Sequence, residues 1–182
     1  MSKSSKFLTA ITATALALVF CLASFITAGA ATRKVTTGTT KPSKAPAVKK
    51  GTTRVKIKKR GAIVKFKAPE TRTYTITFSK VRNYKGQNKR VNGFAAIKEN
   101  RYGYMIKLKA KTNFGKSTSF HVCSPKYYKI HYVNGTKKPK KTSDPMKTRY
   151  AKLKLKKGQK YYIASYLYGV KNAKASYTLN IK

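Results

Sequence analysis

Three lysine-rich tracts are the residues of this sequence best suited to binding chemistry. They contain Lys49 and Lys50; Lys56, Lys58, Lys59 and Arg60; and Lys137, Lys138, Lys140 and Lys141. A solvated face that only keeps a protein soluble normally mixes charges of both signs, and these tracts contain no acidic residue. Ammonium groups act as point charges that suit diffuse contact with phosphates or carboxylates. The tracts therefore predict contacts with a polyanion.

Tyrosine is the second unusual residue type, with 13 Tyr in a chain that has no Trp. In the run over residues 160–168, alternation places Tyr162, Tyr166 and Tyr168 on one face. Exposed tyrosines beside lysines can stack on sugars or bases. The alternative is that they pack under loops or against an opposing sheet. Both interpretations are open at the level of sequence.

The chain has few residues of the types that usually carry out catalysis. The acidic residues are Glu70, Glu99 and Asp144. They lie in separate segments, which disfavours hydrolysis by a pair of carboxylates. The chain has too few clustered ligands for zinc, and three scattered acids cannot hold calcium. We therefore expect no enzyme activity, no metal and no cofactor.

Histidine and cysteine leave two weaker catalytic alternatives. His121 and His131 could meet on adjacent strands and cleave RNA by acid–base chemistry. His121 and Cys123 share a face, but Cys/His hydrolases normally draw the pair from distant segments. Structural histidines and a buried, inert thiol are the simpler expectation, with an intermolecular disulfide through Cys123 as the alternative.

The overall charge points to the same kind of partner as the tracts. Lys and Arg number 43 against 3 acidic residues, a formal net charge of +40 over 182 residues. Repulsion among so many cations destabilises a compact state, and salt or a bound anionic polymer relieves it. We expect the partner to contribute to the stability of the fold.

Residues 1–30 have the layout of a secretory signal peptide. Lys3 and Lys6 precede an apolar run, and small residues close it at Ala28-Gly29-Ala30. We expect cleavage before Ala31 and a secreted protein, either extracellular or associated with the cell surface. An uncleaved membrane anchor is the alternative, because the apolar run approaches the length that spans a bilayer.

Residues 31–52 are rich in Lys, Thr and Pro and predict a disordered linker. From residue 53 to residue 182, short runs of alternating apolar and polar residues are broken by Gly, Asn and Pro, as in an all-β chain. Expected strands lie at 55–57, 63–67, 73–78, 94–97, 102–108, 120–122, 128–132, 151–155, 160–168 and 175–181. Asn134-Gly135 is a strong signal for a tight turn. The fold class predicted is a single antiparallel β-sandwich or jelly-roll-like domain, with little helix.

Two segments resemble a known family. Residues 64–70, VKFKAPE, and 74–79, YTITFS, are similar to the "F-x-A-P-E…G-x-Y-T" opening of the bacterial pre-peptidase C-terminal domain. Residues 153–163 and 175–181 are similar to its closing strands, "L-x-x-G-x-x-Y-Y-I" and "Y-T-L-x-I". The resemblance implies a jelly-roll-like β-sandwich of the kind that binds extracellular polymers beside secreted enzymes, here standing alone.

The sequence departs from that family in two places. Arg72 stands where the family has a Gly, and basic residues at 89–92 and 98–101 replace an acidic middle where some members hold calcium. The resemblance therefore implies the fold and not the metal.

The function expected is that of a secreted, non-enzymatic protein that binds anionic cell-wall polymer such as teichoic acid, acidic glycan or extracellular DNA. Nonspecific nucleic-acid binding at low salt follows from the charge, and an anionic membrane surface is a further partner to consider. The alternative function is a membrane-active or antimicrobial effector, although such agents usually carry an amphipathic basic helix and none is visible. The sequence leaves the oligomeric state open.

Overall fold

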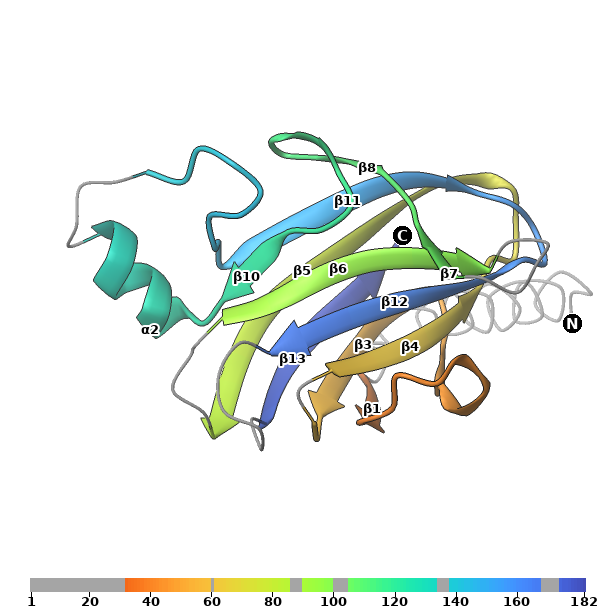
Figure 1. Cartoon of the computed structure of the whole chain (residues 1–182), viewed down its shortest axis with the longest axis horizontal. Helices are drawn as coiled ribbons and strands as arrows, with labels where there is room; N and C mark the ends of the chain where they lie inside the picture. Colours follow the sequence, from red (N-terminus) through yellow and green to blue (C-terminus); the bar gives the residue numbers. More distant parts are fainter. Residues whose placement is uncertain (1–31, 60, 86–89, 100–104, 134–137, 168–173) are drawn as a thin grey trace, which may run out of the picture. The chain divides into compact units, whose positions relative to one another are not determined.

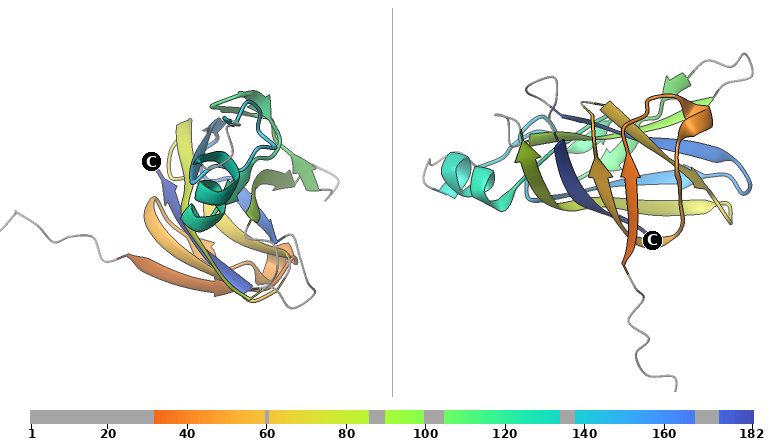
Figure 2. Two further views of the ribbon diagram at one scale, coloured as in Figure 1. Left: turned by 90° about the vertical axis from the view of Figure 1, so that its left-hand side faces the viewer. Right: turned by 90° about the horizontal axis from the view of Figure 1, so that it is seen from below.

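The computed structural model describes residues 32–59, 61–85, 90–99, 105–133, 138–167 and 174–182. In these residues strands dominate, and they form two sheets that pack against one another (Figures 1 and 2). The predicted all-β sandwich is therefore confirmed. Residues 32–182 form one compact unit.

Seven strands form the larger sheet, in the order β1-β3-β13-β5-β11-β8-β9. Their bounds are β1 Arg33–Thr37, β3 Gly51–Ile57, β13 Lys174–Ile181, β5 Arg72–Lys85, β11 Thr148–Leu155, β8 Ala110–Thr112 and β9 Gly115–Ser117. β1 runs parallel to β3, and the other neighbouring strands are antiparallel.

The smaller sheet has the order β10-β6-β12-β4-β2, and β7 also pairs with β6. Its strands are β10 His121–Cys123, β6 Arg90–Glu99, β12 Lys160–Leu167, β4 Gly61–Lys67, β2 Ala47–Val48 and β7 Met105–Lys107. β2 runs parallel to β4, and the remaining pairs are antiparallel. Each sheet thus has one edge where the N-terminal segment adds a parallel strand.

The core is built from alternating buried side chains, a pattern that is clearest on β11 and the first half of β5. On β5, Tyr74, Ile76 and Phe78 are buried, while the threonines between them face outward, as the sequence predicts. Phe78 stacks on Tyr177 of β13, with ring centroids 4.8 Å apart. Burying an apolar side chain of this size contributes about 1.5–3 kcal/mol. The buried side chains thereby fix the register of the strands and the positions of the polar side chains on their outer faces.

The expectation of a disordered linker over residues 31–52 was wrong from residue 33 onward. That segment forms β1, a short 3-10 turn at Pro42–Lys44, β2 and the start of β3. Its composition offers little apolar surface, so the order comes from backbone pairing with strands that occur later in the chain. Thr37 and Val48 are buried, which ties the segment to both sheets.

The strand expected over residues 128–132 was also wrong. α2 spans Pro125–Tyr128 and continues as a π-helical turn at Lys129–Val133. The Ser124 hydroxyl accepts a hydrogen bond from the backbone N–H of Tyr127 at 3.2 Å, and Pro125 occupies the first helical turn. Tyr128 and Tyr132 lie in contact, with ring centroids 5.3 Å apart, at the i, i+4 spacing of a helix.

Besides β1 and β2, two further short strands were not predicted. β8 and β9 form a hairpin in which Gly115 has a φ of +80° and Thr112 donates a hydrogen bond to the Gly115 carbonyl at 2.8 Å. Glycine adopts such a φ without a steric penalty. Asn134-Gly135 lies outside the described residues, as does most of the N-terminal half of the strand expected at 102–108.

Candidate anion-binding groove

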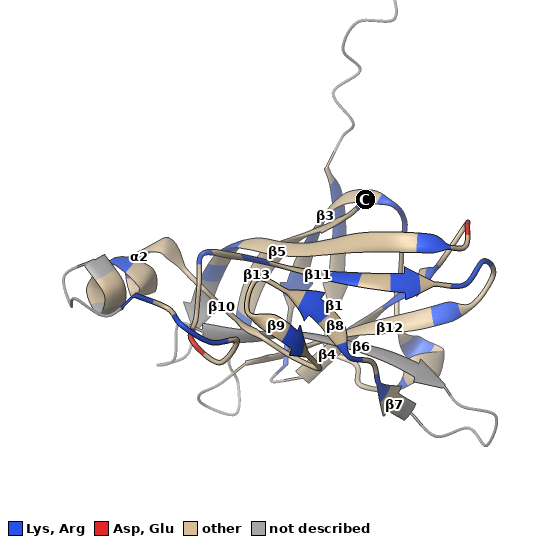
Figure 3. Ribbon diagram, turned by 90° about the horizontal axis from the view of Figure 1, so that it is seen from above, with Lys and Arg blue, Asp and Glu red and all other residues tan. Residues whose placement is uncertain are grey.

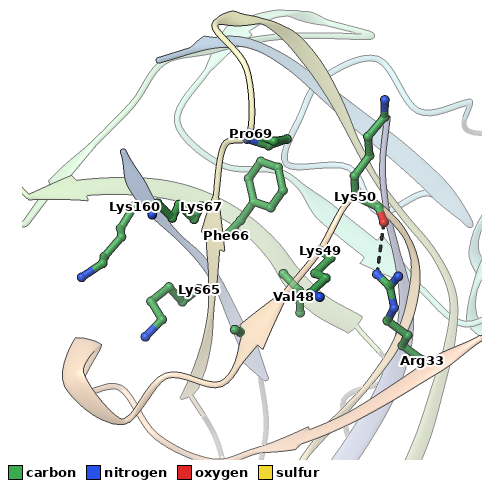
Figure 4. A pocket seen from close by; sticks show the side chains of 10 residues that line it. Arg33, Val48, Lys49, Lys50, Lys65, Phe66, Lys67, Pro69 and Lys160 are labelled. Carbon is green, nitrogen blue, oxygen red and sulfur yellow. Dashed lines mark hydrogen bonds between the residues drawn. The ribbon is translucent and has the colours of Figure 1, made fainter. Parts of the chain in front are cut away.

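A groove of about 570 Å³ lies beside β2 and β4, close to the edges where the N-terminal segment joins the two sheets (Figure 4). Six of its lining residues are cationic: Arg33, Lys49, Lys50, Lys65, Lys67 and Lys160. The remaining lining residues are apolar: Ala47, Val48, Phe66 and Pro69. No acidic residue lines the groove, so nothing in its wall neutralises the positive charge.

The strands of the smaller sheet position three of these cations. Lys65 and Lys67 are two residues apart on β4, with Phe66 between them, and Lys160 of β12 lies directly opposite Lys67 in the strand register. Side chains at directly opposite positions have Cβ atoms about 4.5–5.5 Å apart, and like charges there are destabilising. Lys67 and Lys160 are both exposed. An anion bound between the two ammonium groups would offset their mutual repulsion.

The other side of the groove comes from the N-terminal segment. Lys49 and Lys50 connect β2 to β3, and Arg33 lies on β1. Arg33 Nη1 donates a hydrogen bond to the Lys50 carbonyl at 3.2 Å, drawn in Figure 4. The chain turns into β3 at Gly51, whose φ of +101° favours glycine. The ordered N-terminal segment therefore supplies three of the six cations that line the groove.

An apolar wall distinguishes this groove from a simple cluster of lysines. Phe66 is 1% exposed and Val48 is 5% exposed, and both belong to the main hydrophobic core. The cations lie at the margin of this wall, and the ammonium groups of Lys65 and Lys160 point away from Phe66 toward the outside (Figure 4). The groove can therefore concentrate phosphate or carboxylate groups.

The predicted contact residues are dispersed over the surface. Lys49 and Lys50 line the groove, Lys56 lies on the outer face of β3, and Lys58 and Lys59 follow that strand. Lys138, Lys140 and Lys141 lie in the loop before β11. All of these side chains are exposed, whereas Arg60 and Lys137 lie outside the described residues. Of the predicted contact residues that the structure describes, only Lys49 and Lys50 line the groove.

Sequence reasoning missed four of the groove cations. Arg33 lies in the segment that we expected to be a linker, and Lys65, Lys67 and Lys160 lie in expected strands for which the sequence predicted no contact residue among these lysines. The signal for Lys65 and Lys67 was their alternation with Phe66. Their meeting with Lys49 and Lys50 depends on the pairing of β2 with β4, which no local pattern encodes.

The basic loop before β11 is held by two charged side chains. The Asp144 carboxylate accepts hydrogen bonds from the backbone N–H groups of Lys140 and Lys141 at 2.9 and 3.1 Å. The hydrogen bond from Lys140 is the main cause that lowers the pKa of Asp144, and Lys141 adds to it, while partial burial opposes it. Asp144 therefore orders the backbone of this loop.

Arg149 of β11 supports the same loop from beneath. Its guanidinium is buried and donates hydrogen bonds to the carbonyl oxygens of His121 at 3.0 Å, Lys141 at 2.8 Å and Asp144. It lies 4.8 Å from the centroid of the Phe114 ring. Burial lowers the pKa of Arg149, and the nearby Asp144 carboxylate opposes that effect. Arg149 joins β10 to the loop that presents Lys138, Lys140 and Lys141.

The tyrosines predicted to stack on a ligand have different environments. Tyr162 is 6% exposed and packs with Ala45 and Ile63 in a second apolar cluster, so its prediction as a stacking residue was wrong. The N-terminal segment covers it. Tyr166 is 36% exposed, and Tyr168 lies outside the described residues.

Two of the residues considered for catalysis lie on the same short strand. Cys123 is buried on β10, two residues from His121. Among the residues that the structure describes, no three His, Cys, Asp or Glu side chains gather where they could hold a metal ion. Nor does the described part contain a helix long and apolar enough to cross a membrane.

No family model matches the chain, and no curated protein is significantly similar to it. The resemblance to the pre-peptidase C-terminal domain therefore depends on the strand motifs alone.

Proposed function

We propose that this protein is a secreted, non-enzymatic binding protein for anionic extracellular polymers, such as cell-wall teichoic acid, acidic glycan or extracellular DNA. The observation that carries the proposal is the groove, whose lining includes six cationic side chains and an apolar wall and no acidic side chain. The net charge of +40 supports it, because it favours attraction of polyanions from a distance.

The lysine pair at the groove gives a specific reason for an anion to bind there. Lys67 and Lys160 stand opposite each other on adjacent strands, where like charges are destabilising. A phosphate or carboxylate between the two ammonium groups offsets their repulsion and adds favourable contacts.

Neither of the acidic side chains that the structure describes, Glu70 and Asp144, lines the groove. Glu70 and Asp144 lie in loops, which are the red segments of Figure 3. The Asp144 carboxylate binds backbone N–H groups. The lysines of the groove are thus available to an external anion.

The test is binding of the protein without residues 1–30 to purified wall teichoic acid, an acidic glycan and duplex DNA over a salt series. We expect the logarithm of the association constant to fall linearly with the logarithm of salt concentration. The triple variant Lys65→Thr, Lys67→Thr and Lys160→Thr should weaken binding at least tenfold at 150 mM salt.

The matched control removes the same charge elsewhere. Lys126→Ser, Lys129→Ser and Lys147→Ser change three exposed lysines near α2. This variant should weaken binding less than threefold. Equal losses in the two variants would mean that charge alone acts without a groove, and absence of binding even in dilute buffer would refute the function. Dye leakage from anionic vesicles without polymer binding would favour the membrane-active alternative.

A further inference from the structure

The outer face of the larger sheet has an unusual middle zone. Between Thr73 and Thr77 on β5 and between Ser176 and Asn180 on β13, the outward positions carry hydroxyl or amide groups: Thr73, Thr75, Thr77, Ser176, Thr178 and Asn180. Ser176 is itself buried beneath Arg54, and the cations Arg82 and Lys174 follow at the far end of the two strands. We call these six side chains the hydroxyl zone. Each can donate and accept hydrogen bonds. A face of this kind can exchange hydrogen bonds with another polyol as readily as with water.

A ladder of lysines borders the hydroxyl zone on one side. Lys152 of β11 is in register with Lys111 of β8, which is in register with Lys116 of β9. All three side chains are exposed. Neighbouring strands lie about 4.8 Å apart, so three cations follow one another over about 10 Å. Like charges at opposite positions repel, and the ladder is therefore poised to accept a row of anionic groups.

A second group of cations borders the other side. Lys34 of β1 is in register with Arg54 of β3, and Lys56 lies two residues further along β3. Arg54 is held over the hydroxyl zone, since its guanidinium donates to Ser176 Oγ at 2.6 Å, Thr178 Oγ1 at 3.2 Å and the Lys80 carbonyl at 2.9 Å. It is therefore oriented before any ligand arrives.

The dimensions of the face favour an extended chain. β3 and β11 are separated by β13 and β5, which places the two cationic borders about 14 Å apart with the hydroxyl zone between them. Figure 3 shows basic segments on β11 and β9 of this sheet. No outward residue described on β3, β13, β5, β11, β8 or β9 is acidic.

One aromatic ring completes the surface. Tyr150 precedes Lys152 on the same face of β11, with the Lys152 ammonium 5.8 Å from the ring centroid. Aromatic rings beside charged groups provide an apolar patch for a ring-shaped ligand. Tyr150 lies next to Thr77 in the strand register, so the ring adjoins the hydroxyl zone.

We propose that this face docks an extended acidic polysaccharide, whose hydroxyl groups meet the hydroxyl zone and whose carboxylate or sulfate groups meet the two cationic borders. The inference depends on the proposed function and names one class of polymer for it. A purely charged chain such as polyphosphate would use the borders and leave the hydroxyl zone without a role.

The test separates hydrogen bonding from charge. In Thr75→Val with Thr77→Val, the net charge and the β-branched shape are kept and two hydroxyls are lost. Binding is measured by calorimetry with oligogalacturonate and with inorganic polyphosphate of equal charge. We expect the variant to weaken oligogalacturonate binding at least fivefold and to leave polyphosphate binding within twofold. Lys111→Thr with Lys116→Thr should weaken both.

Thr118→Val with Thr142→Val is the matched control, because these two half-buried threonines lie outside the face. It should leave both affinities unchanged, and melting curves confirm that each variant folds. An unchanged oligogalacturonate affinity in Thr75→Val with Thr77→Val, or equal losses for both ligands, would overturn the inference. That outcome is distinct from failure of the proposed function, in which the unaltered protein binds neither polymer.

Discussion

At the scale of single residues, Arg149 is the side chain whose loss we expect to cost most. Its buried guanidinium satisfies carbonyl oxygens of His121, Lys141 and Asp144. Leaving a buried acceptor without a donor costs about 1–3 kcal/mol. Arg149→Met should therefore lower the free energy of unfolding by about 2–4 kcal/mol in urea titrations. Arg149→Lys should restore little, because an ammonium group lacks the planar fork. A variant as stable as the parent protein would contradict this.

Asp144 makes a pH-dependent contribution of defined sign. Backbone hydrogen bonds, chiefly from Lys140, lower the pKa of this carboxyl in the folded protein. A lowered pKa means that the stabilisation is present above the unfolded-state value, about 3.9, and is lost as pH falls through the folded-state value. Asp144→Asn should be less stable than the parent at pH 7, and the two should converge by pH 2–3. Urea titrations at several pH values measure this, and a constant difference would refute it.

At the scale of elements, the N-terminal segment closes one side of the sandwich. The Thr37 carbonyl accepts from Lys58 N–H at 2.8 Å, while the Thr37 hydroxyl donates to the Ile63 carbonyl at 3.2 Å. The Pro46 carbonyl accepts from Lys65 N–H at 2.8 Å. Deletion of residues 32–48 should therefore lower the melting temperature by more than 5 °C, expose the apolar cluster and increase binding of a hydrophobic dye. If the segment were only a linker, its deletion would leave the melting temperature unchanged, and that result would contradict this prediction.

A milder variant checks the same element without removing it. Ala45 is 5% exposed and packs against Ile63 and Tyr162. Ala45→Asp should lower stability and weaken binding at the groove, because the segment also carries Arg33, Lys49 and Lys50. Ala47→Asp is not a suitable control, since that residue lines the groove.

Elements with one buried face were predictable from sequence, and the others were not. β11 and the first half of β5 alternate cleanly, and β5, β11, β12 and β13 overlap the segments that the pattern predicts as strands. β1 has little apolar content, so its order depends on pairing with β3. The apolar residues of α2 and the turn after it fit the two-residue period of a strand and the i, i+4 spacing of a helix equally well. Ser124 as the N-cap and Pro125 in the first turn favour the helix. The groove needed β2, β4 and β12 to be neighbours, which is a property of topology.

At the scale of the whole molecule, the net charge of +40 couples stability to anions. Screening by salt weakens repulsion among the exposed cations, and an anion bound only by the folded state stabilises it further. At 100 times its dissociation constant, such a ligand adds about 2.7 kcal/mol. We expect the melting temperature to rise with sodium chloride and to rise more with short inorganic polyphosphate at equal ionic strength.

The groove triple variant separates these two contributions. Lys65→Thr, Lys67→Thr and Lys160→Thr remove the opposed lysine pair, so this protein should melt at a higher temperature than the parent at low salt. It should also gain less from polyphosphate, because the site that binds the anion in the folded state is weakened. Differential scanning fluorimetry at fixed ionic strength measures both effects. An equal gain from polyphosphate in the two proteins would show that the stabilisation comes from the charge of the whole surface, without a preferred place.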